Sequence, residues 1–525
     1  MHRKLIAFIA AALVAAGGAA AQRRGGVLKI SACNPGNLSL LEEPEPCGER
    51  PMMGVFNNLI LFDQHQKQVS LESIVPDLAT NWSWSEDGTE LTFRLRQGVR
   101  WHDGKPFTAA DVKCSFELRL GTAPEKLRLN FQKSGLYNLA AVTTNSDFEV
   151  TFHLKRPQPA FPMLLAGGFS GITPCHLPAA ELRTHPIGTG PFKFVEFKPN
   201  ESIKVARNPD YWKPDRPYLD AIEYTIIKDP STAVLAFIAG KFDSTFGYGL
   251  SVPLFKDVQS QVPQAICEMT TTGVNRHLLV NYQKPPFDNS DLRRAMSLSL
   301  DRQAFIDTLA EGEGEIGGVL QPPPEGLWGL SAEQLKQLPA HGPDVNANRA
   351  EGRRIMEKLG YGPARRLDIK VSTRDLPVFR DPAVLLIDQL KHVYIDGELD
   401  LVDTAQYYPK ILRKDYTVGL NLQTSGPDPD PILQVFYGCG ASINWDGYCN
   451  PEVDKLIEQQ SREGDPGKRK ALLWAIEKQL AEDDARPIIF YAKGGTCRQP
   501  WVKGSTIMVN SIFNGWRMED VWLDK

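Results

Sequence analysis

Residues 76–112 read PDLATNWSWSEDGTELTFRLRQGVRWHDGKPFTAADV. Within them, residues 91–96 (LTFRLR) alternate apolar and polar side chains, which is the pattern of a half-buried strand. The pair Asp103-Gly104 indicates a turn, and Thr108 followed by Asp111 indicates the capped start of a helix. The stretch therefore combines a loop with tryptophans, a strand, a turn and a helix start, which are features of a scaffold.

The same mixture of strands and helices continues on both sides of this stretch. Alternation predicts two further strands, at 26–32 (GVLKISA) and 149–154 (EVTFHL). Apolar residues at helical spacing predict helices at 292–311, 348–359 and 467–482. Breaks rich in Pro and Gly fall near 171–191, 284–289, 312–329 and 426–431. A chain of 525 residues is expected to form several such α/β domains, at roughly 100–200 residues each.

The composition disfavours several classes of protein. The chain has 59 Lys+Arg and 63 Asp+Glu, a net charge of −4 and a pI near 6.2. The chain has no excess of basic residues with which to bind a polyanion, so we expect no nucleic-acid partner. With 42% hydrophobic residues, the chain also lacks the composition of a disordered protein.

The N-terminus indicates export. Residues 1–21 begin with His2-Arg3-Lys4, continue into an apolar run and end in small residues, as a cleaved signal peptide does. The apolar run is shorter than the roughly 20 residues that span a bilayer, which disfavours a membrane anchor. No Cys stands at the cleavage site, which argues against a lipid anchor. We therefore expect a soluble periplasmic protein.

Eight cysteines fit an oxidising compartment. Cys439 and Cys449 lie close together in a Gly/Asn-rich loop and are expected to form a disulfide. Cys33 and Cys47, which flank a Pro/Glu-rich loop, are a second candidate pair. The other four have no partner nearby in the sequence and are expected to be buried small apolar residues: Cys114, Cys175, Cys267 and Cys497.

Compact catalytic signatures are absent from the sequence: there is no G-x-x-x-x-G-K-[ST], no H-E-x-x-H and no G-x-S-x-G. Residues 312–317 (GEGEIG) match G-x-G-x-x-G, but they follow an apparent helix and their glutamates would repel a pyrophosphate, so an acidic loop is indicated.

Asp428 and Asp430 could act as paired carboxylates, but no partner base accompanies them. The nine histidines lack the spacing of a metal site. We expect neither an enzyme nor a bound metal or cofactor.

Four later stretches accompany residues 76–112 in a fixed order. They are GTGPFKFVEFKPNESIKVARNPDYW (188–212), LAFIAGKFD (235–243), LLVNYQKPPFDNSDLRRAMSLSLDR (278–302) and the run from Asn450 to Asp483. Together these stretches resemble the family 5 extracellular solute-binding proteins, the oligopeptide, dipeptide and nickel receptors of bacterial ABC importers. The resemblance covers almost all of residues 26–525.

The resemblance implies an α/β fold with two lobes joined by two strands, which close over a ligand by a hinge motion. Lobe I would consist of residues 22–58, 180–275 and 491–525, and an inserted subdomain of residues 59–179. Lobe II would consist of residues 276–490.

The resemblance also implies a ligand site in lobe II. In the peptide receptors an aspartate shortly before the Asp-Pro turn accepts the α-ammonium of the ligand. That position falls here on Ser425, after Gln423 and Thr424, or on Gly426 if the register is shifted by one, and neither residue is acidic. Loss of such an acceptor costs about 1.5–3 kcal/mol, or about ten- to hundredfold in affinity. Asp428, three positions on, is an alternative acceptor.

Other candidates for the site lie nearby in the sequence. Arg413 corresponds roughly to a basic residue that faces ligand carboxylates in some relatives, or it is a solvated surface arginine. Tyr407 and Tyr408 could wall a pocket, and one of them is expected to pack in the core instead. Trp445 could cap a pocket or pack on the Cys439–Cys449 disulfide.

These expectations define the leading hypothesis, a monomeric periplasmic receptor that captures a peptide or peptide-like solute. It would deliver the solute to an inner-membrane permease energised by separate ATPase subunits. The alternatives are a receptor for an opine, a sugar-like solute or a chelated metal, a chaperone or signalling receptor, and a secreted hydrolase using Asp428 or Asp430.

Overall fold

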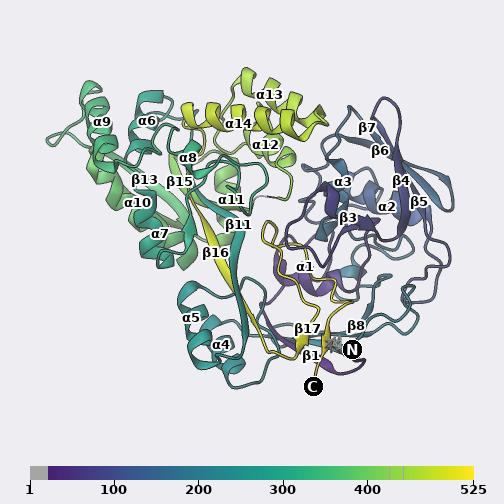
Figure 1. Ribbon diagram of the computed structural model, residues 1–525. Coiled ribbons are helices and arrows are strands. Elements are labelled where there is room, and N and C mark those ends of the chain that lie inside the picture. Colours follow the sequence, from purple (N-terminus) through teal and green to yellow (C-terminus); the bar gives the residue numbers. More distant parts are fainter. Residues whose placement is uncertain (1–21, 425, 442) are drawn as a thin grey trace, which may run out of the picture.

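The computed structural model describes residues 22–424, 426–441 and 443–525. The signal peptide expected at residues 1–21, and Ser425, lie outside the described residues. The chain folds into mixed α/β layers arranged as two lobes (Figure 1), as expected.

Lobe II surrounds a six-stranded sheet with the strand order β12-β16-β11-β15-β13-β14. Its strands are β11 (Ile266–Val280), β12 (Gly314–Glu315), β13 (Leu367–Arg374), β14 (Ile395–Val402), β15 (Val418–Thr424) and β16 (Ile488–Arg498). The helices of this lobe are α6 (Ser290–Leu298), α7 (Arg302–Ala310), α8 (Ala332–Leu335), α9 (Val345–Lys358), α10 (Pro377–Leu390), α11 (Thr404–Leu412), α12 (Asp430–Tyr437), α13 (Pro451–Arg462) and α14 (Pro466–Glu482). Alternate residues of β11 and β15, such as Leu278 and Leu420, pack in one core with α6, α7, α9 and α10.

The expected helix at 292–311 is two helices. α6 ends at Leu298 and α7 begins at Arg302, because the side chain of Asp301 accepts the N–H of Ala304 at 3.0 Å and starts a new helix. The expected helices at 348–359 and 467–482 correspond to α9 and α14.

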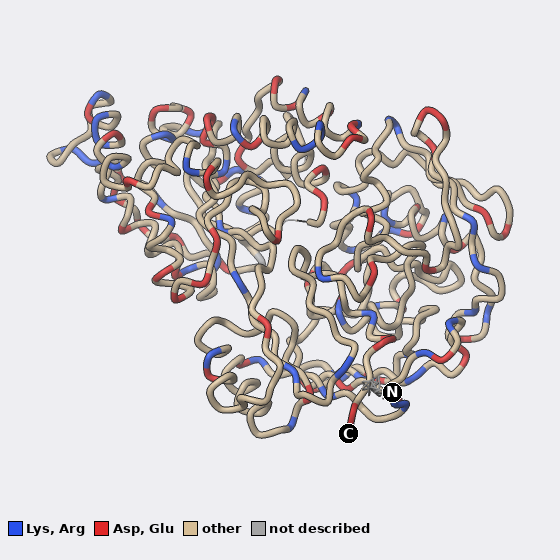
Figure 2. The backbone as a smooth tube through the Cα atoms, viewed as in Figure 1, with Lys and Arg blue, Asp and Glu red and all other residues tan. Residues whose placement is uncertain are grey.

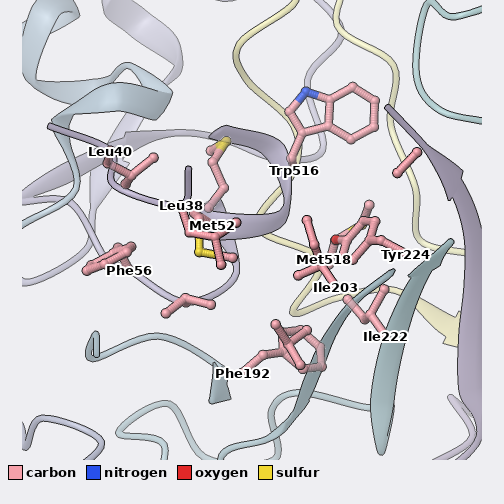
Figure 3. Close-up of a cluster of buried hydrophobic side chains, with 14 of the residues drawn as sticks. Leu38, Leu40, Met52, Phe56, Phe192, Ile203, Ile222, Tyr224, Trp516 and Met518 are labelled. Carbon is pink, nitrogen blue, oxygen red and sulfur yellow. The ribbon is translucent and has the colours of Figure 1, made fainter. Parts of the chain in front are cut away.

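Lobe I is built on the sheet β1-β10-β9-β8. These strands are β1 (Val27–Ala32), β8 (Phe192–Lys198), β9 (Ser202–Arg207) and β10 (Ala221–Ile226), and α1 (Pro46–Met53) covers them. Figure 3 shows that Met52 of α1, Phe192 of β8 and Trp516 of the C-terminal segment converge in one core. The C-terminal segment also carries the short pair β17 (Val502–Lys503) and β18 (Trp522–Leu523).

A second sheet, β4-β5-β7-β6, lies within the range expected for the inserted subdomain. Its strands are β4 (Ala79–Trp84), β5 (Glu90–Leu95), β6 (Leu139–Ser146) and β7 (Glu149–Leu154), and it is accompanied by the hairpin β2 (Ile60–Phe62) and β3 (Ile74–Pro76) and by α2 (Ala109–Leu120) and α3 (Phe161–Ala166). The helix start predicted at Thr108 is confirmed, since Thr108 and Asp111 form a capping box at the start of α2. A buried ion pair between Asp77 and Arg517, at 2.8 Å, joins this subdomain to the C-terminal segment.

Two long strands run from lobe II down to lobe I. β11 and β16 pair antiparallel, from Ile266 opposite Arg498 to His277 opposite Ile488 (Figure 1). Their lower halves pack on α4 (Pro230–Ile238) and α5 (Val252–Gln261). A hinge of two strands is therefore consistent with the path of the chain.

All eight cysteines are paired. The expected disulfides Cys439–Cys449 and Cys33–Cys47 are present. The expectation that the other four are unpaired is wrong, because the fold joins Cys114 to Cys175 and Cys267 to Cys497. The two pairs span 61 and 230 residues, and Cys267 meets Cys497 only because β11 and β16 align them opposite each other.

Charges of both signs are interspersed over both lobes in Figure 2, in keeping with the near-neutral composition. Among the described residues, none of the helices combines the length and apolar character that crossing a membrane requires.

Glu477 of α14 is a buried residue of lobe II that hydrogen-bonds to the loop of residues 318–330. Its buried carboxylate accepts the N–H groups of Leu320 at 3.1 Å and Leu330 at 3.0 Å. Burial raises the pKa of Glu477 to about 7.

This raised pKa predicts a pH-dependent stability. An ordinary glutamate has a pKa of about 4.3, so the folded protein binds this proton more tightly than the unfolded chain. The stabilisation is complete below about pH 4 and is lost as the pH rises towards 7. Glu477→Gln, which cannot ionise, should remove this slope and raise the free energy of unfolding at pH 8 by about 1–3 kcal/mol. Urea unfolding at several pH values measures both quantities, and equal slopes in the two proteins would contradict the assignment.

Candidate ligand-binding cleft

A cavity of about 380 Å³ lies where the lobes face each other. One wall is formed by side chains and backbone within residues 131–136 and 163–170, together with residues 511–514 of the C-terminal segment. The opposite wall is formed by the end of β15, the segment after it, α12 and Ile443. The volume falls within the range of about 300–1,000 Å³ that is typical of small-molecule sites.

Most side chains that line the cavity are apolar. The lobe I and subdomain wall includes Phe131, Leu136, Met163, Leu164, Phe169 and Phe513, and the α12 wall includes Ile432, Val435, Phe436 and Ile443. Neutral polar groups are interspersed: Gln132, Ser134, Ser170, Thr424, Ser511 and Asn514. Among the described residues that line the cavity, Asp428 is the one ionisable group.

Asp428 is neutralised from within lobe II. Both of its carboxylate oxygens accept from the guanidinium of Arg469 at 2.7 Å, and one also accepts the N–H of Asp430 at 3.0 Å. Both residues are 4% exposed, and the guanidinium of Arg469 lies over the ring of Trp328. The carboxylate therefore already has a charge partner and three hydrogen bonds without any ligand.

Asp430 links the lobes. From the inserted subdomain, the hydroxyl of Tyr137 donates to its carboxylate at 2.6 Å and the amide of Gln158 donates at 2.5 Å. From α13, Gln460 donates at 2.5 Å and Ser461 at 3.2 Å. Burial, with repulsion from Asp428 added, raises the pKa of Asp430. The four side chains around Asp430 form what we call the Asp430 bridge, which joins α12 and α13 of lobe II to Tyr137 and Gln158 on the other side.

An aromatic cluster extends from the α12 wall. The ring of Trp445 contacts Phe436 at 5.4 Å and Tyr408 at 5.6 Å, and Tyr408 is 37% exposed. Tyr407 is fully buried, and its hydroxyl donates to the carbonyl of Leu420, so this residue belongs to the core.

Arg374, at the end of β13, lies against this aromatic cluster. Its guanidinium is 4.5 Å from the ring of Phe379 and 5.7 Å from that of Tyr408. Its buried Nε has no hydrogen-bond partner. A planar cation with an unused donor is suited to a carboxylate or carbonyl group.

The remaining sequence candidates differ in their surroundings. Thr424 lines the cavity. Gln423 is buried, and its amide oxygen accepts from Arg486 at 3.0 Å. Arg413 is exposed just after α11 and is not among the residues that line the cavity.

A family model described as "Bacterial extracellular solute-binding proteins, family 5 Middle" matches residues 73–444, well over half of the chain. The chain belongs to this family of bacterial extracellular solute-binding proteins.

Curated relatives match most of the length of this solute-binding protein. Di/tripeptide-binding protein 1 of Pseudomonas aeruginosa (strain UCBPP-PA14) is 27% identical over 461 residues, which cover 82% of this chain and 81% of that protein. The oligopeptide-binding protein OppA of Bacillus subtilis (strain 168) is 27% identical over 446 residues, 79% of each chain.

Solved structures share the fold. A periplasmic binding protein of Helicobacter pylori in complex with the peptide STSA superposes with a TM-score of 0.80 at 22% identity, covering 96% of this chain and 99% of that one. AgaA of A. tumefaciens R10, in complex with agropinic acid, superposes with a TM-score of 0.78 at 24% identity, covering 95% and 99%. These likenesses confirm the expected two-lobed architecture.

The partners of the two aspartates in this solute-binding protein could not be predicted from the sequence. Arg469, Tyr137 and Gln158 are far in sequence from the aspartates that they contact, with separations of 41, 293 and 272 residues. No spacing rule could have found them. Arg374 is the last residue of the alternating strand β13, and a cation at the end of a strand was a usable signal.

Proposed function

We propose that this chain is the receptor component of an ABC importer and captures a small peptide or peptide-like solute in the cavity between its lobes. It would act as a monomer in the periplasm and hand the solute to an inner-membrane permease driven by separate ATPase subunits. The observation that carries the proposal is the cavity itself, enclosed by two lobes that share two long strands and meet at the Asp430 bridge. Peptide-binding relatives over most of the chain support it.

The proposed site combines groups of different chemistry. Thr424 and the residues of the α12 wall would contact the body of the solute. Tyr408 and Trp445 do not line the cavity and would support it from behind Phe436. Arg374, which packs on Tyr408 but, like Arg413, is not among the residues that line the cavity, is the proposed partner for a carboxylate that extends beyond the cavity. Asp428 remains a candidate only if a ligand can share it with Arg469. Ser425 lies outside the described residues.

Two observations keep a non-peptide solute as a second candidate. A structural neighbour is in complex with agropinic acid, which is not a peptide. The acid that lines the cavity is paired with Arg469, which does not favour a ligand with an ammonium group. Catalysis is not part of the proposal, because the same pairing leaves Asp428 unsuited to act as an acid or base.

Thermal-shift and calorimetric titrations of the chain from Gln22 to Lys525 test the proposal. The panel contains dipeptides, longer peptides, opines, oligosaccharides and metal chelates. A ligand at 100 times its dissociation constant should add about 2.7 kcal/mol to the free energy of unfolding. Saturable binding of a small solute at one site per chain is the expected result. Hydrolysis of panel members without a stable complex would contradict the receptor function.

A further inference from the structure

The segment 426–431 (GPDPDP) places two aspartates beside the cavity, and both are used within the protein. The guanidinium of Arg469 donates a hydrogen bond of 2.7 Å to each carboxylate oxygen of Asp428. Tyr137, Gln158, Gln460 and Ser461 surround Asp430, which is fully buried. Each carboxylate is therefore satisfied by other groups of the protein.

The surface left for the ligand is apolar. Ile432, Val435 and Phe436 on one side face a wall that includes Met163, Phe169 and Phe513. A charged ammonium transferred from water to such surroundings loses its hydration and finds no free anion among the described lining residues, which is strongly unfavourable. The neutral groups Gln132, Thr424 and Asn514 can instead pair with amide N–H and C=O groups.

We infer that the cavity selects a small solute that presents an uncharged, apolar, amide-bearing end, such as an N-acylated or cyclised apolar peptide, over the same peptide with a free ammonium. The inference rests on the proposed function. It restricts the expected ligands from peptides and peptide-like solutes in general to those without a free ammonium group. The size agrees with it, because a cavity of about 380 Å³ suits a solute of two or three residues better than a long peptide.

Calorimetric titration with a matched pair of ligands tests the inference. Leu-Leu and N-acetyl-Leu-Leu share their side chains and carboxylate and differ at the N-terminus, which is an ammonium in the first and a neutral acetamide in the second. The acetylated form should bind at least about tenfold more tightly. Equal or tighter binding of free Leu-Leu would overturn the inference while leaving the receptor function intact. If neither form binds while another solute of the panel does, the inference is overturned. A panel in which no solute of any class binds overturns the proposed function as well.

A variant of the cavity wall sharpens the test. Thr424→Asp adds an unpaired carboxylate at the cavity, and Thr424→Asn is the uncharged control of nearly equal size. The aspartate should reverse the preference towards Leu-Leu, whereas the asparagine should retain the wild-type order. Thermal melts confirm that both variants fold. The same order in all three proteins would overturn the inference, because the preference would then not depend on charge at this wall.

Discussion

Replacement of Arg469 by methionine should lower the free energy of unfolding by about 3–5 kcal/mol, because it leaves the Asp428 carboxylate buried without a partner. Both residues of this pair are 4% exposed, and the guanidinium donates two hydrogen bonds to the carboxylate, each at 2.7 Å. Methionine keeps much of the aliphatic volume of arginine, so the loss reports mainly on the charge. Denaturant unfolding followed by fluorescence measures it.

Two further variants separate charge from packing. Arg462→Met removes an exposed arginine that pairs with Glu458 on α13, and it should change stability by less than about 1 kcal/mol. Asp428→Asn added to Arg469→Met should recover part of the loss, since no bare carboxylate then remains. Equal stability of Arg469→Met and Arg462→Met would contradict this account. It would show that the Asp428 carboxylate does not need Arg469 as a charge partner and is available to a ligand.

Loss of the Tyr137 hydroxyl should weaken closure of the lobes. The hydroxyl donates to the buried carboxylate of Asp430 across the cleft at 2.6 Å. A hydrogen bond to a charged group is worth about 1.5–3 kcal/mol, so Tyr137→Phe should shift the closed-to-open ratio by about ten- to hundredfold. Because ligand binding requires the closed form, the apparent affinity for any ligand should fall by up to the same factor.

Small-angle X-ray scattering and calorimetry together measure this effect. Tyr137→Phe should show a larger radius of gyration and weaker binding than the wild type. The control is Tyr394→Phe, which removes a hydroxyl that donates to Glu357 within lobe II and does not bridge the lobes. Identical scattering and affinity in Tyr137→Phe and wild type would show that the Asp430 bridge does not stabilise the closed form.

The scaffold was largely predictable from sequence because its signals are local. Strands β1, β5 and β7 follow alternation, and the start of α2 follows from Thr108 and Asp111, three residues apart. Short loops also predict the Cys439–Cys449 and Cys33–Cys47 disulfides. The pairing of Cys267 with Cys497 depends on the register between β11 and β16, which no local pattern specifies.

The cleft was predictable only in outline. The sequence identifies Asp428 and Asp430 as candidate site residues. The hydrogen bonds and ion pairs that each carboxylate makes, however, involve partners that only the tertiary fold brings close. Arg469 on α14 makes Asp428 an internal ion pair, and Tyr137 of the inserted subdomain makes Asp430 a bridge between lobes. In the sequence, these carboxylates have no evident partner. In the folded protein, both are held by hydrogen bonds to other side chains and stabilise the structure.

The most direct test of a solute receptor with its site between the lobes is calorimetric titration of a cavity-filling variant. Ile432→Trp places an indole in the cavity, and Leu235→Trp adds the same side chain on the exposed face of α4, where Leu235 is 62% exposed. The solute that binds wild type most tightly should bind Leu235→Trp equally well. It should lose about a hundredfold or more in affinity for a folded Ile432→Trp. Unchanged affinity in the folded Ile432→Trp protein would place the ligand elsewhere and contradict the account.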